Sequence, residues 1–259
     1  MKLDLVESLG SRYDSPQQIA RVVTEDWAAR NLYCVACPCD FLTRLLANTR
    51  AVDLFCPQCK QVFQLKSSRN WNQTKIVDAA YASMISAVRS SNVPNLVVMQ
   101  YTNFWKVRNA LLVSSFFFTE TVIEKRKPLS SVAQRAGWVG CNILLKQIPA
   151  DGKLRLIADG VVTPTHRIRS QFNQIRPLSS LAVGLRGWTL DVLNTIRQIQ
   201  KTEFALSEVY SFETQLAAAH PGNRNVREKI RQQLQRLRDL GFLQFVSPGR
   251  YRASMNADG

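Results

Sequence analysis

Two pairs of cysteines constrain this chain more than any other feature of its sequence. Cys34 and Cys37 form one CxxC pair, Cys56 and Cys59 form a second, and 18 residues lie between the pairs. This spacing is typical of a structural zinc site. Four thiolates held in two tight turns make a closed tetrahedral cage, so the metal stabilises the loop and takes no part in chemistry. The pattern therefore predicts a zinc loop.

Two other uses of these cysteines stay open at the level of sequence. Disulfides would need an oxidising compartment, yet residues 1–7 contain no apolar run typical of a signal peptide. A redox-active CxxC is the other alternative, although redox motifs rarely occur in pairs with this spacing. Of the remaining cysteines, we expect Cys39 to be spare and Cys141 to be a buried thiol.

A small set of polar residues lies inside and directly after the cysteine loop. Asp53 follows the apolar pair Ala51-Val52, and residues 61–66 alternate between polar and apolar as a half-buried strand does. Successive side chains of a strand point to opposite faces, so Gln64 and Lys66 share one face. Nucleases of the PD-(D/E)xK type use an Asp and then, on a neighbouring strand, an acidic residue and a Lys two positions apart.

In such a nuclease the carboxylates and the carbonyl between the last two residues hold Mg²⁺, and the Lys orients the attacking water. Here those positions would be Asp53 and Gln64 with the carbonyl of Leu65 as magnesium ligands, and Lys66 as the catalytic cation. Taken alone this pattern is a weak signal. Residues in such a pattern most often have only a structural role.

Several longer segments carry a resemblance to a known family. They are Thr24–Trp27, the two cysteine pairs, Phe63–Ser67, Arg126–Leu129, Arg135–Asn142 and Arg227–Gln235. In their order and spacing they resemble the DpnI-like methyl-directed (type IIM) restriction endonucleases over nearly the full length. The resemblance implies an α/β fold with a PD-(D/E)xK nuclease core, an inserted zinc loop and a C-terminal winged-helix domain. It also implies Mg²⁺-dependent cleavage of GATC containing N6-methyladenine.

The chain departs from the family pattern at one metal ligand, because Gln64 stands where the family has an acidic residue. A Gln carbonyl can coordinate Mg²⁺ but brings no charge. Two interpretations follow. Either Gln64 acts as a neutral ligand while Glu25 or Asp26 supplies charge, or the protein only binds DNA. We favour the first.

The charge of the chain points to a polyanionic partner. It has 34 basic and 19 acidic residues among 259, a net charge of +15. Nucleic acid fits better than an anionic membrane, because no basic amphipathic anchor stands alone and no apolar run approaches the 18 residues of a membrane span. The two histidines, His166 and His220, are too few for a His-based nuclease, and we expect both in loops or on the surface.

The first part of the chain predicts a sheet flanked by helices. Ser15-Pro16 is a helix start followed by apolar residues at helical spacing, among which Trp27 is most simply a core residue. A second helix is expected over residues 75–90, and strands over residues 94–101 and 105–118. Helices and strands in this order form the scaffold that a PD-(D/E)xK site requires.

The stretch after residue 125 is basic and has a tryptophan between two glycines. Arg126 and Arg135 precede Trp138, and Gly137 and Gly140 flank it. The glycines would let the backbone approach DNA, and Trp138 would offer a flat apolar surface to a base methyl group in the major groove. A core Trp on a strand is an equally good interpretation of Trp138.

A domain boundary is expected near residues 181–187, because no acid occurs between Asp159 and Asp191 while arginines, prolines and serines accumulate there. We interpret this stretch as a flexible basic linker. It divides the chain into an endonuclease domain with the zinc site at residues 1–182 and a winged-helix domain at residues 183–259.

The second domain is expected to contain three helices and a hairpin. The helices are predicted at residues 187–199, 206–219 and from about 223 to 240, and the hairpin strands at residues 242–246 and 250–253. In a winged helix the third helix lies in the major groove.

The third helix has an apolar stripe and a separate basic face at 100° per residue. An arginine face is usually only solvated, but the residues from 224 to 252 include eight basic residues against Glu228 and Asp239. We therefore predict DNA contacts from this face and from the hairpin, made by Arg224, Arg227, Arg231, Gln235, Arg238, Arg250 and Arg252.

These observations predict a cytoplasmic bacterial enzyme, a monomer, that cleaves double-stranded DNA containing N6-methyladenine and uses Mg²⁺ for catalysis and Zn²⁺ for structure. The alternative is a non-catalytic methyl-DNA-binding regulator with the same zinc loop and winged helix. Lys66 favours the enzyme, since a binding protein needs no lysine at that position.

Overall fold

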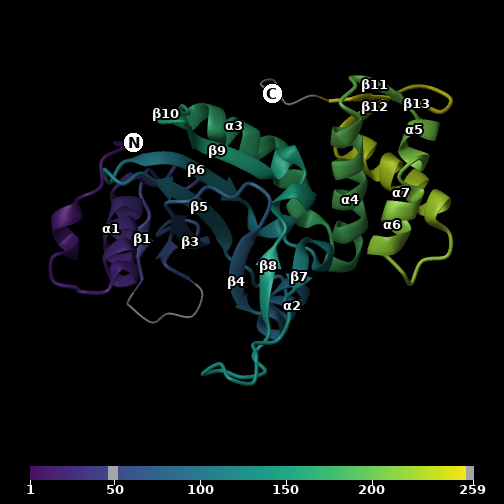
Figure 1. Cartoon of the computed structure of the whole chain (residues 1–259). Coiled ribbons are helices and arrows are strands. Elements are labelled where there is room, and N and C mark those ends of the chain that lie inside the picture. The colour runs from purple at the N-terminus through teal and green to yellow at the C-terminus, as the bar shows by residue number, and fades with distance from the viewer. Residues whose placement is uncertain (46–51, 255–259) are drawn as a thin grey trace. The chain divides into compact units, whose positions relative to one another are not determined.

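A computed structural model describes residues 1–45 and 52–254 of the chain. Ala51, which belongs to the apolar pair before Asp53, lies outside these residues. The chain forms two compact units, each assembled from separate stretches of sequence (Figure 1). The first unit holds residues 1–72, 93–115 and 153–175, and the second holds residues 73–92, 116–152 and 176–259.

The first unit is built on a seven-stranded sheet with the order β1-β2-β3-β5-β6-β9-β10. β3 and β5 run parallel, and the other neighbouring strands described in this sheet are antiparallel. The strands are β1 Thr43–Arg44, β2 Leu54–Phe55, β3 Val62–Ser68, β5 Asn95–Tyr101, β6 Val107–Val113, β9 Lys153–Ala158 and β10 Val161–Val162. β5 and β6 are almost wholly buried, which explains their continuous apolar sequence.

Helix α1 (Pro16–Asn31) packs against β3 and β1. Trp27 is fully buried, as predicted, and its Nε1 donates a hydrogen bond to the carbonyl of Lys2 at 2.8 Å. Thr24 Oγ1 lies 3.1 Å from Ser67 Oγ, which joins the helix to the strand. A 3-10 turn, η1 (Glu7–Gly10), precedes the helix.

The second unit contains a small antiparallel sheet of the order β4-β8-β7. Its strands are β4 (Ile76–Ala80), β7 (Ile123–Lys125) and β8 (Gly140–Ile143), and helix α2 (Tyr81–Arg89) follows β4 directly. The prediction of a single helix over residues 75–90 is therefore wrong for its first third, because Ile76–Ala80 forms a strand. Those residues pair instead with β8, whose partner residues lie 60 to 67 positions further along the chain, so no local pattern reveals the pairing.

The strand predicted over residues 105–118 is also shorter than expected, because β6 ends at Val113 and a 3-10 turn follows. Such turns connect the remaining elements. They are η2 Ser115–Phe117, η3 Glu120–Val122, η4 Leu145–Gln147, η5 Ala150–Gly152 and η6 Arg176–Ser180.

The stretch predicted as a flexible basic linker is ordered, which corrects that interpretation. Helix α3 (Thr165–Ile175) buries Ile168 and Phe172, and η6 leads from it toward α4. Arg186 is almost fully buried and donates through Nη2 to the carbonyl of Leu181 at 2.8 Å. Some of these arginines therefore satisfy backbone carbonyls of the protein itself.

The C-terminal part of the second unit has the helix and strand order of a helix-turn-helix domain with a β-hairpin. Its elements are α4 Val183–Ile199, β11 Glu203–Ala205, α5 Leu206–Tyr210, α6 Glu213–Ala219, α7 Val226–Asp239, β12 Leu243–Ser247 and β13 Arg250–Ala253. The strands form a sheet of the order β11-β13-β12. Two details differ from the prediction. The connector after α4 contains a strand, and the second predicted helix is broken into α5 and α6.

No helix within residues 1–45 or 52–254 is both long and apolar enough to cross a membrane.

Candidate active site, metal loop and DNA-facing surfaces

Asp53 is fastened to strand β3 through both its backbone and its side chain. Its amide donates to the carbonyl of Phe63 at 2.9 Å, and its Oδ2 accepts a hydrogen bond from the amide of Leu65 at 2.7 Å. Leu65 is the residue between Gln64 and Lys66. The structure therefore brings Asp53 next to the short stretch of β3 that the sequence singles out.

Gln64 and Lys66 lie on one side of β3, with Phe63 on the other. Phe63 is fully buried, whereas only 9% of Gln64 is exposed and Lys66 is half-buried. A buried amide needs polar partners, because desolvating it without a hydrogen bond is costly. A carboxylate directly before β2 is thus placed beside a buried amide and a lysine amine of the neighbouring strand β3.

The charges around Asp53 include one acid from α1. Burial raises the pKa of the Asp53 carboxyl above its usual value, and the negative charge of Glu25 raises it further. The Leu65 amide and the positive charges of Arg21 and Lys66 oppose this rise. A nearby cation would stabilise the charged form of such a partly desolvated carboxylate.

Glu25 and Asp26 have different environments, which the sequence left open. Glu25 accepts from Arg21 at 2.6 Å and from Arg44 at 2.7 Å, and its side chain is mostly buried. Asp26 pairs with Arg30 one turn further along the helix. Glu25 is therefore the acid whose charge reaches Asp53. The i, i+4 spacing of Arg21 and Glu25 was readable from the sequence, but no local pattern linked Arg44 to this group.

The four predicted zinc ligands come together. The sulfur atoms of Cys34, Cys37, Cys56 and Cys59 all lie within 4.8 Å of one another. The closest pairs join the two motifs, with 3.5 Å between the sulfurs of Cys34 and Cys59 and 3.5 Å between those of Cys37 and Cys56. Ligands about 2.3 Å from a tetrahedral zinc ion stand a little under 4 Å apart. The cluster can hold a metal ion of this kind.

The thiols of the cluster differ in acidity. Burial acts to raise the pKa of Cys56, but the amides of Cys59 and Gln58 and the neighbouring thiols outweigh it and lower this pKa to about 6. Burial raises the pKa of the Cys34 thiol, although amides of its own CxxC turn also point to that sulfur. Amides directed at sulfur stabilise thiolates, the form that binds metal.

The two other cysteines lie outside the cluster. All six cysteines are free thiols. Cys39 is buried and donates to the carbonyl of Phe41 at 3.2 Å. Cys141 is fully buried in β8, as predicted.

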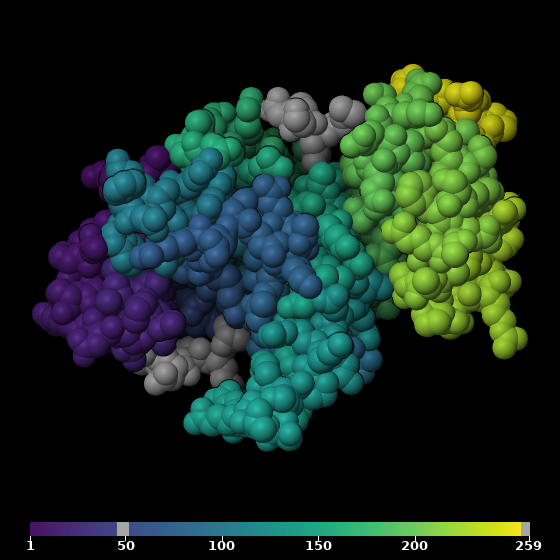
Figure 2. All heavy atoms as spheres, viewed as in Figure 1, coloured from purple at the N-terminus to yellow at the C-terminus, as the bar shows by residue number. Residues whose placement is uncertain are grey.

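The basic stretch containing Trp138 forms the connection between β7 and β8 and projects from the second unit (Figure 2). Backbone hydrogen bonds from Arg126 to Gly140 at 3.0 Å and from Leu129 to Trp138 at 2.9 Å close its base. Arg135 is exposed and Trp138 is half-buried. We name residues 126–139 the basic hairpin loop.

Gly140 has a different role from the one predicted. It is buried, and a Cβ there would lie 2.7 Å from the ring of Trp138. The glycine therefore gives room to the indole and does not serve as an approach to DNA. Gly137, with a φ of +77°, is exposed in the loop, where glycine tolerates a left-handed conformation.

Helix α7 has the two faces predicted for it. The apolar residues Val226, Ile230, Leu234 and Leu237 are buried. Four of the predicted DNA-contacting residues are exposed on the other face, namely Arg227, Arg231, Gln235 and Arg238, and Arg224 is exposed in the segment just before the helix begins at Val226.

Several of these arginines pair with acids on the surface of the domain. Arg227 donates to Glu213 at 2.8 Å, Arg231 to Glu228 at 3.1 Å, and Arg238 to Asp239. Exposed pairs contribute only about 0–1 kcal/mol, so phosphates can replace these partners at little cost.

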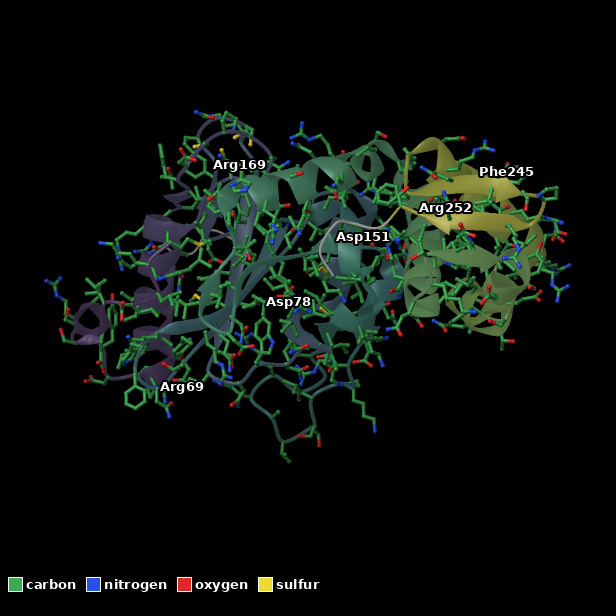
Figure 3. The ribbon with its side chains drawn as sticks, turned by 90° about the horizontal axis from the view of Figure 1, so that it is seen from above. Arg69, Asp78, Asp151, Arg169, Phe245 and Arg252 are labelled. Carbon is green, nitrogen blue, oxygen red and sulfur yellow. The ribbon has the colours of Figure 1, made fainter. Side chains whose placement is uncertain are left out.

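The hairpin of β12 and β13 presents basic and apolar groups together. Figure 3 shows Phe245 and Arg252 on its two strands. Arg250 and Arg252 are exposed, and 54% of Phe245 is exposed. Arg252 pairs with Glu203 of β11 at 2.6 Å.

His220 lies in the connection directly after α6, in keeping with the loop expected from the sequence, but its side chain is partly buried, whereas His166 is exposed on α3. The ring of His220 stacks on Trp188 with 4.0 Å between centroids, and its Nε2 lies 2.8 Å from Asp191 Oδ2. The histidine ends α6 and fixes it to α4, a structural role that no spacing in the sequence signals.

Two family models match the chain. The first, for the DpnI or Dam-replacing family, matches residues 1–181, and the second, for the Dam-replacing HTH domain, matches residues 184–253.

Proposed function

The chain belongs to the DpnI family of methyl-directed restriction endonucleases, and on that premise we propose that it cleaves double-stranded DNA at GATC containing N6-methyladenine. The reaction is Mg²⁺-dependent hydrolysis of a phosphodiester. The observation that carries this proposal is the hydrogen bond from the Leu65 amide to Asp53, which places a carboxylate beside Gln64 and Lys66.

The residues around Asp53 could bind a magnesium ion as the active site of a PD-(D/E)xK nuclease does. Asp53, Gln64 and the carbonyl of Leu65 are the oxygen ligands that hard cations prefer. When bound, the ion supplies positive charge to the scissile phosphate. Lys66 orients the attacking water and stabilises the negative charge that develops on the phosphate.

Gln64 lowers the metal affinity of this site without removing its chemistry. It offers an oxygen but no charge, so Asp53 carries the only formal charge among the three ligands. Glu25 adds negative potential, yet Arg21 and Arg44 hold its carboxylate and compensate its charge. We expect cleavage to need a higher concentration of Mg²⁺ than an acidic residue at position 64 would require.

Zinc in the four-cysteine cluster stabilises the loop that leads to Asp53. The sulfur separations, the directed amides and the absence of bonded sulfur pairs among the described cysteines support this assignment. A closed set of four thiolates leaves no position for water or substrate, so this zinc is structural.

Recognition of the site uses two surfaces of the chain. In the domain division proposed here, residues 1–182 form the endonuclease domain and residues 183–259 the winged-helix domain. Helix α7 would enter the major groove, and the β12–β13 hairpin would follow the phosphate backbone. The basic hairpin loop would add Arg126, Arg135 and Trp138. The enzyme would act as a monomer on the DNA of a bacterial cytoplasm.

A binding protein without activity is the second candidate, favoured by one observation, the uncharged Gln64. One experiment separates the two: digestion of methylated and unmethylated plasmid with and without Mg²⁺ or Mn²⁺. We expect fragments only from methylated plasmid with a divalent ion present. Intact methylated plasmid under all conditions, together with tight binding of the same DNA, would establish the regulator instead. Cutting of unmethylated plasmid would exclude methyl dependence.

A further inference from the structure

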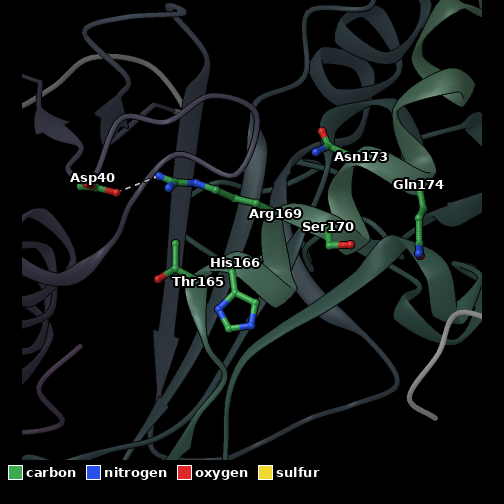
Figure 4. A pocket seen from close by; sticks show the side chains of 7 residues that line it. All are labelled: Asp40, Thr165, His166, Arg169, Ser170, Asn173 and Gln174. Atoms are coloured by element: carbon green, nitrogen blue, oxygen red, sulfur yellow. Dashed lines mark hydrogen bonds and ion pairs between the residues drawn. The ribbon is translucent and has the colours of Figure 1, made fainter.

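Arg169 turns from helix α3 toward the cysteine loop, although it lies in a basic stretch without acids. Figure 4 shows its side chain extending to Asp40, with which it forms an ion pair of 3.0 Å. Only 24% of the side chain is exposed, and the guanidinium lies 5.3 Å from the centre of the Tyr33 ring. The guanidinium therefore interacts with groups of the protein itself.

The guanidinium holds both ends of the first metal-binding turn. Nε donates to the carbonyl of Cys34 at 3.2 Å, and Nη2 donates to the carbonyl of Cys39 at 3.0 Å. The amide of Cys34 also donates to the carbonyl of Cys39 at 3.0 Å. One planar fork therefore bridges the residues that open and close the turn carrying Cys34 and Cys37.

This turn has no helix or strand to give it shape. Residues 32–42 are free of helix and strand, and the fork reaches them from a helix about 130 positions later in the chain. A loop of this kind would lose conformational entropy when it closes around a metal ion. An arginine that already fixes the two carbonyls reduces that loss.

We propose that Arg169 is a positioning residue for the metal loop, one that orders the Cys34–Cys37 turn before the ion binds and slows its release afterwards. The inference rests on the zinc assignment of the proposed function. It does not concern the site around Asp53. Groups outside the first ligand shell commonly change metal affinity by about 10- to 100-fold. A lysine can replace the arginine only in part, because an ammonium keeps the charge but lacks the planar fork.

The test measures zinc directly. The full-length protein and its Arg169→Gln and Arg169→Lys variants are purified with zinc, and release to the chelator 4-(2-pyridylazo)resorcinol is followed by absorbance. His166→Ala is the matched control, because His166 lines the same surface pocket as Arg169 from the same helix. We expect release about 10- to 100-fold faster for Arg169→Gln, an intermediate rate for Arg169→Lys, and the wild-type rate for the control.

Thermal unfolding with and without zinc separates positioning from general stability. A positioning role predicts that Arg169→Gln reduces the rise in melting temperature that zinc gives. If Arg169→Gln lowers the melting temperature equally in the zinc-loaded and zinc-free forms, or leaves the zinc release rate unchanged, the inference is overturned while the zinc assignment stays intact. If Arg169→Gln does not fold, the zinc release rate and melting temperatures of Arg169→Lys alone test the inference. Wild-type protein without bound zinc would instead refute the zinc assignment itself.

Discussion

The Oδ2 atom of Asp53 accepts a hydrogen bond of 2.7 Å from the amide of Leu65, so a carboxylate is anchored to the middle of the Gln64–Lys66 stretch. A side chain anchored by backbone needs little rearrangement when a cation or a phosphate arrives. Preorganised charge of this kind is commonly the largest contribution to catalysis.

Replacement of Lys66 by Ala should separate binding from cleavage. In the proposed mechanism the amine acts only on the attacking water and the developing charge, so its loss should lower the single-turnover cleavage rate by about 10²- to 10³-fold. Binding of methylated duplex in Ca²⁺, measured by fluorescence anisotropy, should change little. Lys106→Ala, at an exposed lysine of the same unit, is the control. Equal cleavage by both variants would remove Lys66 from the mechanism.

Restoring an acid at position 64 should strengthen metal binding. Gln64→Glu adds a formal charge with almost no change of shape, and the affinity of oxygen-ligand sites follows the number of charged ligands. The Mg²⁺ concentration for half-maximal cleavage should fall by about tenfold or more. Gln18→Glu adds the same charge at an exposed position of α1 and should leave the titration unchanged. A lower Mg²⁺ requirement in both variants would point to net charge alone.

The exposed arginines of α7 should determine the salt dependence of DNA binding. In the proposed binding mode Arg227 and Arg231 each contact one phosphate, so the slope of log K against log salt should fall by about 0.9 for each alanine substitution. Arg89, exposed on α2 and paired with Glu120, is the matched control. A slope that stays at the wild-type value in the double variant would place DNA on another surface.

The basic hairpin loop should influence methyl discrimination through Trp138. Burying one methyl group contributes about 0.8 kcal/mol, and 1.4 kcal/mol corresponds to a factor of ten. Trp138→Ala should therefore reduce the preference for methylated duplex by about fourfold for each methyl that it contacts. Gly140→Ala should act in the same direction, because the new Cβ would displace the indole ring. An unchanged affinity ratio in both variants would make Trp138 a structural residue only.

The sequence predicted elements whose own side chains determine their structure. Helix α1 and strand β3 appear where their periodicity places them, and the buried stripe of α7 is confirmed. The cysteine cluster was predictable for a similar reason, since the CxxC turn brings two ligands together locally. In each case the signal comes from residues that are close to one another in the sequence.

Elements that depend on remote partners were missed. β4 is a strand because it pairs with β8, and β11 is a strand because it pairs with β13. The local sequence favours a helix for β4 and a loop for β11. Likewise, the choice between Glu25 and Asp26 follows from the phase of α1 and from Arg44, which only the folded chain brings close. Gly140 was misassigned because its neighbour, the Trp138 ring, folds back on it.

The inward and outward stripes of α7 share no residue, and this separation has a consequence for altering the protein. Substitutions on the outward side leave the packing of Val226, Ile230, Leu234 and Leu237 untouched. A library randomised at Arg231, Gln235 and Arg238 should thus yield mostly folded members. New sequence preferences could be selected from it without re-engineering the domain beneath.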